Sequence, residues 1–154
     1  MPFLCALGLT GVTVLVHTIG TLGLILLLAG VRRRRRGRQP APLASAFEIV
    51  GVVTALLLLH FLEAGAWAAF YSAAELLPDV ATAFYFSLTS YTTVGYGDVI
   101  LPVRWRILGP FEAAAGILMF GWSTAVMVTT VTRVYGSRLR LQTGVTGEGN
   151  VPNR

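Results

Sequence analysis

The sequence has few charged residues, a single cysteine and no lysine. One cysteine, Cys5, excludes a disulfide within the chain. Only 12% of the 154 residues are charged and 55% are hydrophobic, with a mean hydropathy of +0.70, which excludes a soluble globular domain. We therefore expect a membrane protein, and the length leaves no room for a second domain.

Residues 3–31 form an uncharged run of 29 residues. This run is longer than the ~20 residues that a helix needs to cross a ~30 Å hydrocarbon core. A cleaved signal peptide would carry basic residues ahead of a shorter apolar core, whereas here they follow the run. Residues 1–31 are therefore predicted to be a transmembrane helix that stays in the mature protein.

All 12 basic residues are arginines, opposed by 7 acidic residues, and half of them form one cluster directly after this first segment. Five consecutive arginines cover every face of a helix, unlike the every-third spacing of a voltage sensor, and nothing else in the sequence favours nucleic acid. Basic residues next to a membrane segment favour the cytoplasmic side, so the N-terminus is expected outside. The cluster is expected to bind anionic lipid headgroups: Arg32, Arg33, Arg34, Arg35, Arg36 and Arg38.

Residues 32–46, which include Pro40 and Pro42, are predicted to be a basic cytoplasmic linker. The next helix is expected to begin near Ser45 or Ala46, which places Glu48 in its first turn.

This second apolar helix, at about residues 47–71, contains His60 and Glu63. Both are costly in hydrocarbon unless they are paired or face a cavity. A structural contact between helices is the simplest interpretation, and a proton sensor or a metal site is the alternative. A metal is disfavoured because His60 and Glu63 supply two ligands, whereas a closed zinc site needs four. Aromatic residues at the end of the segment are expected at the outer membrane interface: Trp67, Phe70 and Tyr71.

His17 is the predicted partner of Glu63. At 1.5 Å per residue the two lie at about 15 and 12 Å below the outer boundary, so they share a depth. A hydrogen bond between them would dock the first helix on the second and could make opening pH-sensitive, with His60 as the competing partner. The polar face around His17 is expected to contact protein: Thr10, Thr13, His17 and Thr21.

Residues 80–92 are mostly apolar but extend only about 20 Å as a helix, which is too short to span the membrane. Pro78 and Asp79 are typical of a helix start, with Asp79 as cap. The segment should therefore re-enter and return to its own side. Gly95 and Gly97, in the loop that follows, permit backbone angles that other residues avoid, so successive carbonyls can face one side and form a cation site.

Residues 92–98, Thr-Thr-Val-Gly-Tyr-Gly-Asp, resemble the selectivity filter of potassium channels. The resemblance implies that carbonyl rings replace the water shell of permeant K⁺, with no other cofactor. Since the chain holds one copy and such pores need four, it also implies a homotetramer. The implied K⁺ ligands are Thr93, Val94, Gly95, Tyr96 and Gly97.

The third spanning helix is expected at about residues 107–132. In the resemblance, Gly116 is the hinge that opens the gate, whereas close helix packing is an equally good account of Gly121. The similarity covers residues 49–135, the two-helix pore domain of small bacterial potassium channels. Counting arginines gives ten on the predicted cytoplasmic side against two outside, which places the C-terminus inside and the loop outside.

The residues expected to support the filter depart from the family pattern. Many potassium channels have two tryptophans where this chain has Tyr85 and Phe86, and one of them donates to the filter aspartate, here Asp98. Tyr85 is the remaining donor. Thr89 stands where some bacterial members have a carboxylate, so the clamp on the filter is altered. Glu112 is expected either behind the filter or paired with Arg104 or Arg106.

The sequence thus predicts an all-α, multi-pass protein of the cell membrane and not an enzyme. Its parts are an extra helix (1–31), a linker (32–46), a pore domain (47–135, with pore helix 80–92 and filter 93–97) and a disordered cytoplasmic tail (136–154). The expected function is a K⁺-selective tetrameric channel without a voltage sensor. The alternatives are a weakly selective cation pore and a non-conducting membrane subunit. The gating stimulus is not predicted.

Overall fold

The computed structural model describes residues 1–34 and 42–144, and every regular element in them is a helix, which confirms the predicted fold class. Within these residues, α1, α2 and α4 are long and apolar enough to cross a membrane. The elements are α1 (Pro2–Arg34), α2 (Pro42–Ala73), α3 (Val80–Tyr91), the 3₁₀ turn η1 (Val103–Trp105) and α4 (Leu108–Gly144).

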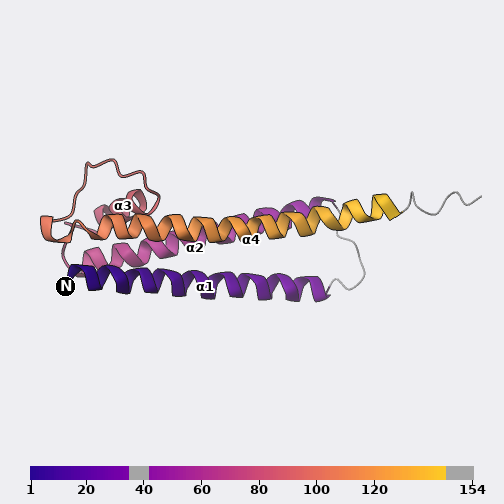
Figure 1. Cartoon of the computed structure of the whole chain (residues 1–154), viewed down its shortest axis with the longest axis horizontal. Helices are drawn as coiled ribbons and strands as arrows, with labels where there is room; N and C mark the ends of the chain where they lie inside the picture. Colours follow the sequence, from indigo (N-terminus) through magenta and orange to yellow (C-terminus); the bar gives the residue numbers. More distant parts are fainter. Residues whose placement is uncertain (35–41, 145–154) are drawn as a thin grey trace, which may run out of the picture.

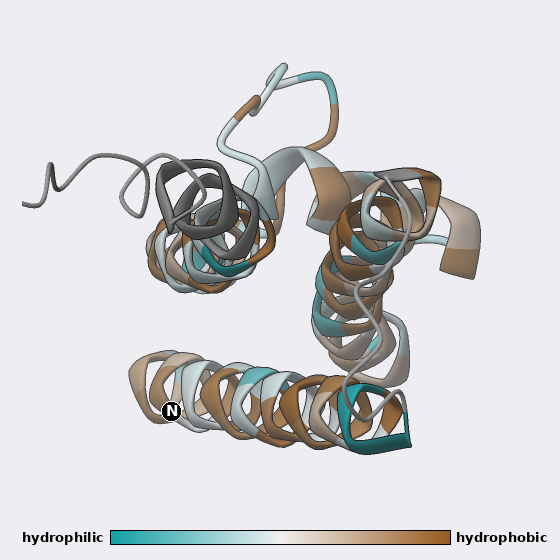
Figure 2. Ribbon diagram, turned by 90° about the vertical axis from the view of Figure 1, so that its right-hand side faces the viewer, coloured by the Kyte–Doolittle hydropathy of each residue, from teal (hydrophilic) through white to brown (hydrophobic). Residues whose placement is uncertain are grey.

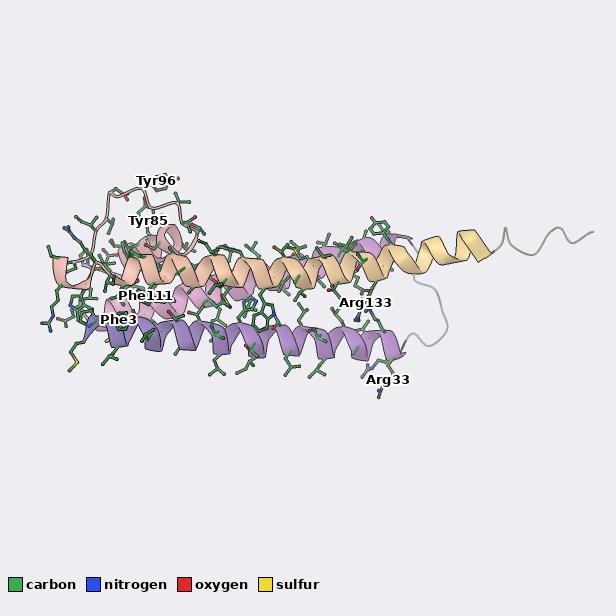
Figure 3. All side chains as sticks on the ribbon, viewed as in Figure 1. Phe3, Arg33, Tyr85, Tyr96, Phe111 and Arg133 are labelled. Carbon is green, nitrogen blue, oxygen red and sulfur yellow. The ribbon has the colours of Figure 1, made fainter. Side chains whose placement is uncertain are left out.

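The long helices lie side by side, and α3 lies at the end of the bundle that holds the N-terminus (Figure 1). α1 packs against both α2 and α4, and α3 packs against the same two helices. Arg33 and Arg133 lie toward the opposite end from Tyr85 and Tyr96 (Figure 3). These two arginines and the loop after α3 are therefore separated along the bundle.

The helix ends near Arg33 and Arg133 (Figure 3) differ from the sequence predictions. α2 begins at Pro42 and not near residue 46, because proline fits the first helical position, where its missing N–H costs nothing. Glu48 is consequently beyond the first turn, and it accepts a 3.0 Å hydrogen bond from Nε of Arg32 on α1. Residues 35–41 of the predicted linker, which include Arg35, Arg36 and Arg38, lie outside the described residues.

The predicted disordered tail is wrong for residues 136–144, which belong to α4. This stretch contains Arg138, Leu139, Arg140 and Leu141, which are strong helix formers and extend the helix past the apolar segment. Residues 145–154 lie outside the described part of the chain.

The core at the end of the bundle that holds α3 is built around aromatic residues of α2 and α3. Trp67 and Tyr71, predicted to mark the membrane interface, are instead buried inside the chain. Each ring also satisfies its polar atom there: Trp67 Nε1 donates to Thr13 Oγ1 at 2.8 Å, and Tyr71 donates to Glu112 at 2.7 Å. The surrounding buried residues are Ala6, Ala68, Ala83, Phe86, Leu101, Leu108 and Ala115.

The polar face of α1 contacts protein, as predicted, with Thr13, His17 and Thr21 buried. Large apolar side chains remain exposed along all three long helices, among them Leu15, Leu58 and Leu118. The share of the most apolar window buried inside the chain is only 11% for α1, 22% for α2 and 28% for α4. The loop after α3 stands away from the bundle on the side opposite α1 (Figures 1 and 2). The apolar surface that the chain leaves exposed must be covered by lipid or by further copies of the chain.

Candidate functional site

The start of α3 is fixed by Asp79, which is the helix cap that the sequence predicts. Its carboxylate accepts hydrogen bonds from the backbone N–H and the hydroxyl of Thr82, both at 2.8 Å. These bonds favour the charged form and lower the pKa of Asp79. At its other end the helix stops at Tyr91, and the Thr93 N–H donates to the Ser90 carbonyl at 2.9 Å. α3 thus delivers the chain into the loop at a defined point.

The loop backbone alternates between ordinary and left-handed conformations. Thr93, Gly95 and Gly97 have φ values of 63°, 49° and 78°. The Gly95 N–H donates to the Thr89 carbonyl at 3.0 Å, which ties the loop to α3. Glycine accepts this backbone freely, whereas Thr93 adopts it at a cost of about 1–3 kcal/mol. The glycine signal was visible in the sequence, but nothing there marked Thr93 as left-handed.

Asp98, directly after the loop, is held by Tyr85. The Tyr85 hydroxyl donates to Asp98 Oδ2 at 2.7 Å, and the Val99 N–H donates to Oδ1 at 3.0 Å. The Tyr85 hydrogen bond is the main reason that the pKa of Asp98 is lowered. The hydroxyl of Thr89 instead donates to the Phe86 carbonyl at 2.9 Å, so Thr89 supports the loop through its backbone carbonyl.

Glu112 lies behind α3, fully buried. It accepts the hydrogen bond from Tyr71 and is hydrogen-bonded to Ser87 on α3. Arg106, one of the two arginines predicted as alternative partners of Glu112, instead donates from Nε to the Leu101 carbonyl at 3.3 Å. Glu112 therefore joins α4, α2 and α3.

A second buried polar cluster joins α1 to the base of the loop. His17 Nδ1 lies 2.7 Å from Glu63 Oε1, which is the contact that the depth argument predicts. His60 Nδ1 lies 3.4 Å from Glu63 Oε2, so the competing partner is present as well. Tyr91, the last residue of α3, donates to Glu63, and Ser123 on α4 lies 3.0 Å from His60 Nε2. Tyr91 and Ser123 could not be predicted as members of this cluster, because no local sequence pattern links them to α1 or α2.

The two glycines singled out on α4 have different surroundings. A Cβ at Gly116 would overlap the Tyr91 carbonyl oxygen and lie 3.0 Å from its carbon. A Cβ at Gly121 would meet nothing within 4 Å. Gly116 thus lets α4 approach the end of α3. A side chain at Gly121 would make no contact within the same chain.

Two helices long enough to span a membrane, α2 and α4, flank the short helix α3 and its loop, which is consistent with the pore domain of a channel. A family model described as "Ion channel" matches residues 55–133, and the chain belongs to this family. It is therefore a channel protein and not an enzyme. α1 lies outside the matched region.

Among curated proteins, the chain is similar to potassium voltage-gated channel subfamily A member 6 of Mus musculus and of Rattus norvegicus. It is 30% identical to each over 90 residues, which cover 58% of this chain and 16% of each relative. The chain thus spans less than a fifth of their length. No solved structure matches significantly.

Proposed function

We propose that four copies of this chain form a pore that passes K⁺ selectively down its electrochemical gradient. The observation that carries this proposal is the alternating left-handed backbone at Thr93, Gly95 and Gly97. A chain with this alternation can turn the carbonyls of residues 93–96 toward one axis, where they replace the hydration shell of the ion. The Thr93 hydroxyl would add a further ring of oxygens below them.

The exposed side chains of the loop support a tetramer. Val94 is 51% exposed and Tyr96 is 74% exposed in the single chain, although both are largely apolar. In a ring with cyclic symmetry these side chains pack against neighbouring copies while their carbonyls face the axis. Since the loop stands on the side of the bundle opposite α1, α1 lies at the periphery of such a ring (Figure 2).

The distribution of arginines supports an orientation with the loop and N-terminus outside and the C-terminus in the cytoplasm. Arg33 and Arg133 lie at the end of the bundle away from the loop (Figure 3), and arginine favours the cytoplasmic side. A groove of about 270 Å³ between α1 and α4 is lined by Arg32 and Arg133 together with apolar residues. This groove fits an anionic lipid, with its headgroup at the arginines and its chain against the apolar wall.

Flux into liposomes tests the proposal. We expect purified protein to pass K⁺ along its gradient, with little flux when Na⁺ replaces it. Gly95→Ala and Gly97→Ala should each reduce K⁺ flux to background, because a Cβ disfavours φ values of 49° and 78°. Gly51→Ala, in α2 with nothing near its Cβ, is the control that should conduct normally.

Each alternative function has its own outcome in the same assay. Equal K⁺ and Na⁺ flux would indicate a weakly selective cation pore. Absence of both fluxes in protein that has formed tetramers would indicate a non-conducting subunit. Normal K⁺ flux through either glycine variant would contradict the assignment of the filter.

A further inference from the structure

Three potential metal ligands, His17, His60 and Glu63, converge where α1 lies against α2. Their ligand atoms all lie within 4.8 Å of one another. The exposed fraction is 0% for His17 and Glu63 and 7% for His60. The two ligands on α2 are too few for a closed zinc site, which is why the sequence disfavours a metal, but the fold adds His17 from α1.

Both histidines present the same nitrogen to the carboxylate. Nδ1 of His17 lies 2.7 Å from Glu63 Oε1, and Nδ1 of His60 lies 3.4 Å from Oε2. The other nitrogens share one partner, since Ser123 Oγ lies 3.0 Å from His60 Nε2 and 3.5 Å from His17 Nε2. A serine oxygen has two lone pairs and can accept from both N–H groups. When both histidines carry their proton on Nε2, both Nδ1 lone pairs point toward Glu63.

Two imidazole lone pairs that face a carboxylate need a cation between them. A proton serves in the hydrogen-bonded arrangement, and a divalent ion can take its place. Zn²⁺ bonds of ~2.0–2.1 Å set tetrahedral ligand atoms about 3.3–3.4 Å apart. The His60–Glu63 distance already has this value, and the His17–Glu63 distance needs to open by about 0.6 Å to reach it.

The surroundings complete a coordination site. Tyr91 OH lies 3.1 Å from His60 Nδ1 and hydrogen bonds to Glu63, so it lies next to the same group of ligand atoms. Ser123 acts as the outer partner that orients both imidazoles, as is usual for metal-bound histidines. Two nitrogens and a carboxylate with one further oxygen suit zinc better than calcium or magnesium, which prefer all-oxygen sites.

We propose that His17, His60 and Glu63 bind one Zn²⁺ or similar divalent transition-metal ion per chain, with Tyr91 or a water as fourth ligand. The ion bridges α1, α2 and the last residue of α3. It therefore fastens the extra helix to the segment that carries the filter. This site does not depend on conduction through the pore.

The test uses the full chain in detergent, stripped with a chelator and titrated with Co²⁺, whose visible absorption reports four-coordinate nitrogen and oxygen ligands. We expect saturation at one ion per chain, displacement of Co²⁺ by Zn²⁺, and a higher melting temperature with metal bound. Affinity should fall as the pH is lowered, because protons compete for the same atoms.

Variants separate the site from non-specific binding. His17→Gln and Glu63→Gln should each weaken Co²⁺ binding more than 10-fold, and Ser123→Ala about 10-fold through loss of the outer partner. Thr21→Val, on the same buried face of α1, is the matched control that should bind as the unmodified chain does. Circular dichroism without metal establishes that each variant is folded.

The proposal is overturned if the unmodified chain shows no stoichiometric Co²⁺ spectrum, or if folded His17→Gln binds as tightly as the control. Neither result bears on the proposed channel function, which the flux measurements test. Loss of K⁺ flux with normal Co²⁺ binding would instead contradict only the proposed function.

Discussion

Asp98 and Tyr85 are joined by a hydrogen bond between the loop and α3. The carboxylate accepts the Tyr85 hydroxyl at 2.7 Å, and this bond holds the pKa of Asp98 below its usual range. A group with a depressed pKa contributes stability above its unfolded pKa and loses it as the pH falls through the folded value. The contact should therefore persist below the ordinary aspartate pKa of about 3.9.

Tyr85→Phe removes the largest cause of that shift, so the pKa of Asp98 should rise toward the ordinary value. The Asp98 carboxyl should then take up its proton at higher pH, which an NMR titration of labelled aspartate measures. Tyr135→Phe, on an exposed ring at the far end of α4, is the control and should leave the titration unchanged. An unchanged Asp98 titration in Tyr85→Phe would show that the hydroxyl does not hold the carboxylate.

Gly116 and Gly121 allow packing and hinge roles to be told apart. Gly116→Ala places a methyl group against the Tyr91 carbonyl, and overpacking of this kind costs about 1–3 kcal/mol. Gly121→Ala meets nothing in its own chain and replaces glycine by a better helix former, so it should be neutral or stabilising. Thermal melting in detergent measures both. If Gly116→Ala melts normally and changes only channel opening, the residue is a hinge and not a packing contact.

At the scale of the elements, α1 is attached through a buried contact that can be measured as a coupling. Removing one partner of a buried pair costs about 3–5 kcal/mol because the other is left uncompensated. His17→Leu and Glu63→Leu should each lower the stability of the tetramer, and the double variant should recover part of the loss. We expect a coupling energy of about 1–3 kcal/mol from melting with a chelator present, so that no metal contributes. Strictly additive losses would show that His17 and Glu63 do not couple and that α1 is held by its other contacts with α2 and α4.

The sequence predicted the elements better than the contacts between them. The length of residues 80–92 alone required re-entry, and the cap at Asp79 follows from its side chain, so α3 could be placed within a residue. The depth of His17 against Glu63 also followed from helical rise. Which faces of two helices meet depends on the tertiary structure. The roles of Tyr91 and Ser123, and the close approach at Gly116, could therefore not be read from any local pattern.

For the whole molecule, α1 and the loop after α3 lie on opposite sides of α2 and α4 (Figures 1 and 2). α1 covers the polar face of the bundle through His17 and Thr13, while the loop lies on the other side (Figure 1). A tetramer built around the loop places its axis beyond α3 and leaves α1 toward the lipid. In such a tetramer, any effect of α1 on the loop passes through Glu63 and Tyr91 at the end of α3 and through the contacts of α1 with α4.

The proposed orientation rests on the position of Arg33 and Arg133 at the end of the bundle away from the loop (Figure 3), and it is tested by labelling. In a Cys5→Ser background, we expect Val103→Cys, which is 77% exposed at the loop end, to react with a membrane-impermeant maleimide added outside intact cells. Arg33→Cys, exposed at the opposite end, should react only after the membrane is opened. Removing one of ten cytoplasmic arginines leaves the charge difference intact, so the variant should keep its orientation. Labelling of Arg33→Cys in intact cells would reverse the assignment and place the filter on the cytoplasmic face.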